Sequence, residues 1–119
     1  NPQSTLQVER YGVQTGFGTF NAQVGVAYTI DTYDISVTDF KTAEYTLFFE
    51  YNNDIQSQKV MIMQNGTTAY AQEWAVMSHT DLIVTATSTL SGNDCKLEIV
   101  PETGVSGLTT YRFTRQAML

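Results

Sequence analysis

The sequence predicts an all-β protein, an antiparallel β-sandwich or jelly roll of about eight strands. Residues that suit a pleated surface, namely Thr, Val, Tyr and Phe, are plentiful. Turn-forming residues recur about every ten positions, and no segment has a convincing helical period. The chain has 119 residues, which is enough to close one core, so we expect a single domain over residues 1–119.

Residues 1–41 are expected to supply N-terminal strands or a docking arm. The stretch "GVQTGFGTF" has glycines at positions 12, 16 and 18, which predict a loop or a bulged edge. The next run puts Val24, Val26, Tyr28 and Ile30 on one face. The apolar phase then shifts to positions 33, 35 and 37, which requires a bulge or a turn at Asp31–Thr32.

The segment "AEYTLFFEY" (43–51) is the cleanest predicted strand, and a turn follows at 52–54. Two further β-like runs flank Asn65–Gly66, which is the strongest short-range hairpin signal and predicts a two-residue type I′ turn. That turn pairs Ile62 with Ala69 on one face and Met61 with Tyr70 on the other. Both faces of the hairpin are therefore partly apolar, and we expect one to lie in the core and the other to be covered.

Three more runs complete the set: "LIVTATST", "CKLEIV" and "LTTYRFTR". Loops are expected between them at 91–94 and 101–107. The segments "TAEYTLFF" and "AQEWAVM" resemble short helices, but their aromatic and β-branched neighbours favour strands. Cys95, the only cysteine, alternates with Leu97 and Ile99 and is predicted to be a buried thiol.

The composition excludes several classes of function. Twelve acidic residues against six basic ones give a net charge of −6, which argues against binding a nucleic-acid backbone. No segment approaches the ~20 apolar residues of a membrane helix. The N-terminus has neither an initiating Met nor a signal pattern, so we expect a chain that was processed or cut from a longer one.

Candidate catalytic and metal-binding residues are weakly supported. Ser78, His79 and Asp81 supply the residue types of a catalytic triad. Because they are near-neighbours in one predicted loop, their side chains cannot easily reach the geometry of nucleophile, base and orienting group. Glu44 and Glu50 fall on the outward phase of one strand, so periodicity offers no pocket for glycoside hydrolysis. Loop carboxylates at positions 31, 34, 39 and 54 match no calcium-loop spacing. We expect no enzymatic activity, no cofactor and no transition metal.

The aromatic residues allow two readings. Trp74, Tyr70 and the other tyrosines could form a platform that stacks sugars, or they could fill the core or an interface, which we favour. Asn65–Gly66–Thr67 also fits a glycosylation sequon, but the turn itself needs the Asn. The residues that we expect at an interface are Met61, Met63, Tyr70 and Trp74.

An ordered series of short motifs runs through residues 42–119. The motifs are Ala43–Tyr45, Gln56–Gln58, Val60–Met63, Asn65–Thr68, Glu73–Trp74, Ser91–Asn93, Leu97–Val100 and Thr109–Arg115. In this order they resemble a β-rich, jelly-roll-like domain of virion structural proteins from tailed phages, in particular phages of marine cyanobacteria and related hosts. One departure is that Met61 and Met63 stand where that family often has Val or Leu.

The resemblance implies a non-enzymatic part of a virion, such as a capsid decoration protein or a component of a tail fibre or appendage. Its implied partners are further copies of itself and other virion proteins. The rival hypothesis is a carbohydrate- or receptor-binding module that uses Tyr and Trp faces to contact a host surface glycan. An acidic β-sandwich with an apolar hairpin favours assembly through surfaces.

Overall fold

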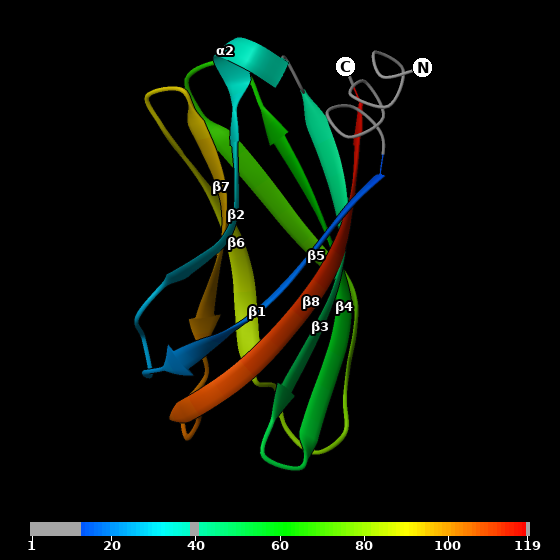
Figure 1. The fold of residues 1–119 in the computed structure, drawn as a ribbon, viewed down its shortest axis with the longest axis vertical. Coiled ribbons are helices and arrows are strands. Elements are labelled where there is room, and N and C mark those ends of the chain that lie inside the picture. The colour runs from blue at the N-terminus through cyan, green and yellow to red at the C-terminus, as the bar shows by residue number, and fades with distance from the viewer. Residues whose placement is uncertain (1–12, 39–40, 119) are drawn as a thin grey trace.

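The computed structural model describes residues 13–38 and 41–118, which form a sandwich of two antiparallel sheets (Figure 1). The elements are β1 (Val13–Ala22), β2 (Tyr28–Asp34), α2 (Ile35–Thr38), β3 (Thr42–Tyr51), β4 (Asp54–Gln64), β5 (Ala69–Ser78), β6 (Val84–Ser91), β7 (Asp94–Pro101) and β8 (Gly107–Met118). The predicted all-β sandwich of about eight strands is confirmed. Both helix-like segments are strands, β3 and β5.

The strands are divided unequally between the two sheets. One sheet has five strands in the order β1-β8-β3-β4-β5, and the other has three in the order β2-β7-β6. Every neighbouring pair is antiparallel. The chain passes from one sheet to the other between β1 and β2, between β2 and β3, between β5 and β6, and between β7 and β8 (Figure 1).

The core fills the space between the sheets, because alternate residues of each strand point inward. On β3 the inward residues Ala43, Tyr45, Leu47 and Phe49 are buried, as the alternation predicts. Cys95 is a buried free thiol, also as predicted. The remaining buried apolar residues come from both sheets and from two loops: Ala22, Ile30, Tyr33, Val60, Ile62, Ile83, Val84, Leu97, Ile99, Val105, Phe113 and Ala117.

The glycine-rich stretch forms a regular edge strand, β1, so of the two predictions the loop is wrong, and the edge is correct but without a bulge. Gly16 lies opposite Phe113 and Gly18 lies opposite Tyr111 on β8. A Cβ on Gly16 would lie 2.4 Å from Phe113 Cζ, and one on Gly18 would lie 2.8 Å from the Tyr111 hydroxyl. These two glycines therefore leave space for aromatic rings of the neighbouring strand. Gly12 lies outside the described residues.

The second strand begins later than predicted. Val24 and Val26 are exposed in the connection before β2, which starts at Tyr28. The predicted irregularity exists, but it lies at Ile30, where the register against β7 shifts between Thr29 and Asp31. A bulged residue lets Ile30 and Tyr33 both face the core, although they are three positions apart.

The strand predicted to continue through position 37 instead turns into the short helix α2. Asp34 Oδ1 accepts hydrogen bonds from the Ser36 N–H and hydroxyl, at 2.8 and 2.6 Å. The Ile35 N–H donates to the carbonyl of Asn93 in the β6–β7 turn. Asp34 thus acts as an N-terminal cap, which favours a helical turn over a strand.

The hairpin predicted at Asn65–Gly66 is confirmed, but its loop has four residues rather than two. β4 ends at Gln64, which pairs with Ala69. Asn65 Oδ1 accepts hydrogen bonds from the N–H groups of Thr67 and Thr68, at 3.0 and 2.8 Å. The Asn side chain therefore closes the turn as an acceptor, a role that a backbone pattern does not reveal.

The longer loop moves the pairing by two positions. Met61 lies opposite Gln72 rather than Tyr70, and Tyr70 lies opposite Met63. Since side chains alternate with a period of two, a two-residue shift keeps each side chain on its predicted face. Ile62 is buried and Met61 is exposed, as expected.

Polar side chains also cross the interior. Arg115 Nη1 and Asp31 Oδ2 form an ion pair at 2.8 Å between β8 and β2. Gln56 Oε1 accepts hydrogen bonds from the N–H groups of Ile83 and Val84, at 2.6 and 3.2 Å, and its Nε2 donates to the Val84 carbonyl. The two sheets are thus joined by specific polar contacts as well as by apolar packing.

Candidate functional site

The outer faces of the two sheets differ in chemistry. The outer face of the three-stranded sheet carries polar rows in which Thr29 and Thr87 flank Glu98, and Thr32 and Thr89 flank Lys96. The outer face of the five-stranded sheet, called here the five-strand face, instead carries large apolar side chains. Those with substantial exposure are Val13, Phe17, Ile55, Met61, Met63, Tyr70, Trp74, Met77 and Leu108.

The four predicted interface residues all lie on the five-strand face. Met61 and Met63 are on β4, and Tyr70 and Trp74 are on β5. Their exposed fractions are 41%, 46%, 49% and 37%, respectively. They form one apolar region at the β4–β5 end of the sheet, which we call the hairpin patch.

A second region of the five-strand face is set by the strand register. Phe17 on β1 lies opposite Arg112 on β8, which lies opposite Phe48 on β3. The same row continues to Ser57 on β4 and Met77 on β5. Two aromatic side chains therefore flank an arginine in one line across three strands.

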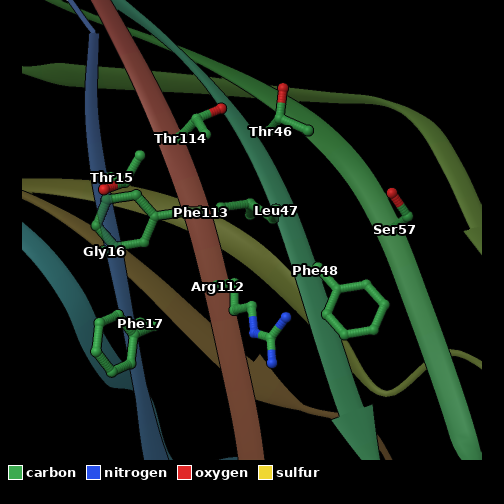
Figure 2. A pocket seen from close by; sticks show the side chains of 10 residues that line it. All are labelled: Thr15, Gly16, Phe17, Thr46, Leu47, Phe48, Ser57, Arg112, Phe113 and Thr114. Atoms are coloured by element: carbon green, nitrogen blue, oxygen red, sulfur yellow. The ribbon is translucent and has the colours of Figure 1, made fainter.

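An open groove of about 570 Å³ follows this row. Figure 2 shows the Arg112 guanidinium between the rings of Phe17 and Phe48, with threonines in the row above. Those threonines, Thr15 and Thr114, lie directly opposite each other, and Thr46 continues their row on β3. Phe17 is 84% exposed, so its ring is available to a ligand.

The charges on the five-strand face nearly balance, although the chain as a whole is acidic. Lys59 Nζ lies 3.3 Å from Glu44 Oε1 in a partly exposed ion pair, which contributes little stability. Glu50 and Arg112 are the other charged residues of β3 and β8 on this face. Most of the excess negative charge therefore lies on other surfaces.

Of the residues considered as a triad, Ser78 ends β5, and His79 and Asp81 lie in the loop that follows it. The His79 N–H donates to the Ile55 carbonyl at 3.0 Å, and the N–H groups of Thr80 and Asp81 donate to the Asp54 carboxylate. Desolvation raises the pKa of Asp54. The hydrogen bonds that its carboxylate accepts from the N–H groups of Thr80, Asp81 and Ile55, together with the charge of His79, outweigh desolvation and lower this pKa below its ordinary value. The loop is thus tied down by Asp54.

The acidic residues considered for calcium or hydrolysis are dispersed. Asp31 pairs with Arg115 in the interior, Asp34 caps α2, and Asp39 lies outside the described residues. Glu44 and Glu50 are on the outer face of β3, as predicted. Within the described ranges, no three His, Cys, Asp or Glu side chains gather where they could hold a metal ion. No helix in those ranges is long and apolar enough to span a membrane.

Sequence reasoning missed the groove residues Phe17, Phe48 and Arg112. Phe17 lies in the run for which the sequence predicts a loop or a bulged edge, and Phe48 is adjacent to the apolar face of its strand without being on it. The signal that could have found them is the outward phase of each strand, where an aromatic residue is unexpected in a water-facing position.

Comparison with known proteins shows a likeness in fold. No protein-family model matches the chain, and no curated protein sequence matches it. The tailspike protein of Acinetobacter phage vB_ApiP_P1 is similar over 92% of this chain, with a TM-score of 0.62 and 12% identity. The tailspike protein gp49 of Acinetobacter baumannii bacteriophage Fri1, a capsular polysaccharide depolymerase, is similar over 89%, with a TM-score of 0.52 and 12% identity.

The chain spans less than a quarter of either tailspike, covering 23% of the first and 18% of the second. At 12% identity the likeness establishes a shared fold. The chain therefore has the fold of a β-rich part of phage tailspike proteins.

Proposed function

We propose that this chain is a non-enzymatic domain of a phage tail appendage, of the tailspike or tail-fibre kind. It acts by self-association and by docking onto other virion proteins. The observation that carries the proposal is the fold that it shares, over most of its length, with part of two phage tailspikes. These neighbours favour a tail appendage over a capsid decoration protein. They come from Acinetobacter phages and give no support for a host among marine cyanobacteria, so the proposal names no host.

The hairpin patch is the proposed contact surface. Met61, Met63, Tyr70 and Trp74 expose apolar area on one side of β4 and β5. Contiguous exposed apolar side chains are a common mark of an interaction site. The opposite sheet presents threonines and charged residues, so only one side of the sandwich suits burial against a partner.

Self-association is tested by light scattering on a concentration series of the chain. We expect the average mass to rise with concentration. The double variant Met61→Gln/Met63→Gln is expected to weaken association about tenfold or more, because each buried Met side chain contributes about 1.5–3 kcal/mol and ~1.4 kcal/mol is a factor of ten. Gln is close to Met in length, so packing within the sheet is little disturbed.

Val24→Gln is the matched control, since Val24 is also exposed but lies in the connection between β1 and β2. It should leave association unchanged. A chain that stays monomeric throughout the series would contradict self-association. An electron micrograph of the particle that places this chain on the capsid shell, away from the tail, would contradict the tail-appendage role.

A further inference from the structure

The groove on β1, β8 and β3 is distinct from the hairpin patch. The row Phe17–Arg112–Phe48 forms part of its lining, and its volume of about 570 Å³ falls in the range of small-molecule sites. Neighbouring strands lie about 4.8 Å apart, so the two phenylalanines are roughly 10 Å apart with the arginine between them. This spacing is fixed by the sheet and needs no rearrangement.

Arg112 is an available cation in this groove. Among the described residues it forms neither an ion pair nor a hydrogen bond. The other arginine of β8, Arg115, is buried and paired with Asp31. An exposed guanidinium offers a planar fork of donors that matches a carboxylate. Although the chain as a whole has a net charge of −6, the Arg112 guanidinium gives the groove a local positive charge that attracts an anionic ligand.

Hydroxyl groups line much of the rest of the groove, beside the apolar residues Gly16, Leu47 and Phe113. Thr15, Thr114 and Thr46 form the adjacent row, and Ser57 extends the aromatic row. A hydroxyl both donates and accepts a hydrogen bond. The outward side chains of the lining thus combine two flat apolar rings, one cation and four hydroxyls.

We propose that this groove binds an acidic saccharide, that is, a sugar chain bearing carboxylates. The phenylalanine rings pack against the apolar C–H faces of sugar rings, and Arg112 forms a bidentate contact with a sugar carboxylate. The threonine and serine hydroxyls exchange hydrogen bonds with sugar hydroxyls. A peptide strand is disfavoured over the middle of the groove, because β8 and β3 are paired on both sides and neither has a free backbone edge.

The inference goes beyond the proposed function, because it concerns a different part of the five-strand face. Self-association depends on Met61 and Met63, whereas saccharide binding depends on Phe17 and Arg112. An experiment can therefore contradict either proposal without contradicting the other.

The test is calorimetric titration of the full chain with oligogalacturonate, with a neutral oligogalactoside as the comparison probe. We expect the acidic oligomer to bind at least tenfold more tightly than the neutral one, and its affinity to fall as salt is raised. Arg112→Gln is expected to weaken oligogalacturonate binding about tenfold or more, because it removes a charge-assisted contact. Phe17→Ala is expected to weaken binding of the acidic oligomer too, and it loses no core packing because the ring is exposed.

Lys96→Gln is the matched control. It removes one positive charge from the outer face of the three-stranded sheet and should leave binding unchanged. The proposal would be overturned by equal affinity for the two probes, by no binding at millimolar oligomer, or by equal losses in Arg112→Gln and Lys96→Gln. It would also be overturned if Arg112→Gln reduced self-association in light scattering without affecting sugar binding, since the groove would then be a contact between copies.

Discussion

Arg115 on β8 and Asp31 on β2 form an ion pair that connects the two sheets through the interior of the sandwich, with 2.8 Å between Nη1 and Oδ2. The side chains are only 5% and 14% exposed. Asp31 Oδ2 also accepts a hydrogen bond from the Tyr45 hydroxyl at 2.6 Å, and Arg115 donates to Gln14 on β1. The Arg115 guanidinium carbon lies 5.5 Å from the centre of the Tyr33 ring. One buried contact therefore joins four strands.

Removing one partner of this pair should destabilise the fold strongly. Asp31→Ala leaves the buried Arg115 charge without its carboxylate, which costs about 3–5 kcal/mol in such pairs. Urea unfolding followed by fluorescence measures the change in free energy of unfolding. The double variant Asp31→Leu/Arg115→Met should lose much less, because no unpaired charge remains. A loss below ~1 kcal/mol for Asp31→Ala would contradict this role.

Stability should fall in alkaline solution because of Tyr45. Burial, and then the charge and hydrogen bond of Asp31, raise the pKa of Tyr45 well above its ordinary value. A raised folded pKa means that the unfolded tyrosine loses its proton first, so the stabilising contribution is complete below about pH 10 and declines above it. The expected slope for one such tyrosine is about 1.4 kcal/mol per pH unit.

This prediction is checked by urea unfolding at a series of pH values between neutral and strongly alkaline. Tyr45→Phe should reduce the slope above about pH 10. Tyr70→Phe is the control, because Tyr70 is exposed on the five-strand face and its change should leave the slope as it was. Equal slopes in all three proteins would contradict the assignment to Tyr45.

Gly16 should not tolerate a side chain. Its added Cβ would lie 2.4 Å from Phe113 Cζ, so the ring must move within a packed core. Gly16→Ala is therefore expected to cost about 1–3 kcal/mol, as overpacking does. Thermal unfolding measures the loss, and Thr15→Ala on the outward side of the same strand should have a much smaller effect. Unchanged stability in Gly16→Ala would show that Phe113 moves freely.

Gln56 should be needed for the junction between β4 and β6. Gln56→Leu keeps the side chain's approximate size but leaves the N–H groups of Ile83 and Val84 without their acceptor. Buried donors left unsatisfied cost about 1–3 kcal/mol each. Hydrogen exchange should show faster exchange at Ile83 and Val84 first, and protection retained there would contradict the prediction. Gln72→Leu, on exposed β5, is the control.

The fold class and most strands could be predicted from the sequence because inward residues alternate cleanly, as on β3. Alternation also placed Met61 and Met63 on the outer face, even with the wrong hairpin loop. The predictions that failed, a strand through position 37 and a two-residue hairpin loop, concern places where a side chain accepts hydrogen bonds from the backbone. Asp34 caps a helical turn and Asn65 closes a four-residue loop, and neither effect changes the hydrophobic period.

The groove could not be predicted for a different reason. Phe17, Phe48 and Arg112 are far apart in sequence and meet only because β8 lies between β1 and β3. Periodicity assigns a face to each residue, but it does not give the order of strands. The polar residues Gln56 and Arg115 fell on apolar faces, and their partners come from the other sheet.

The side chains that reach across to β6 also affect how separate molecules can meet. β6 is an edge of the three-stranded sheet, and an open edge is a template for a strand of another chain. Here Gln56 bonds to both backbone groups of Val84, and the Glu73 carboxylate accepts the N–H of Ala86. An incoming strand would have to displace both side chains. Separate copies of the chain are thereby kept from pairing into one continuous sheet along β6.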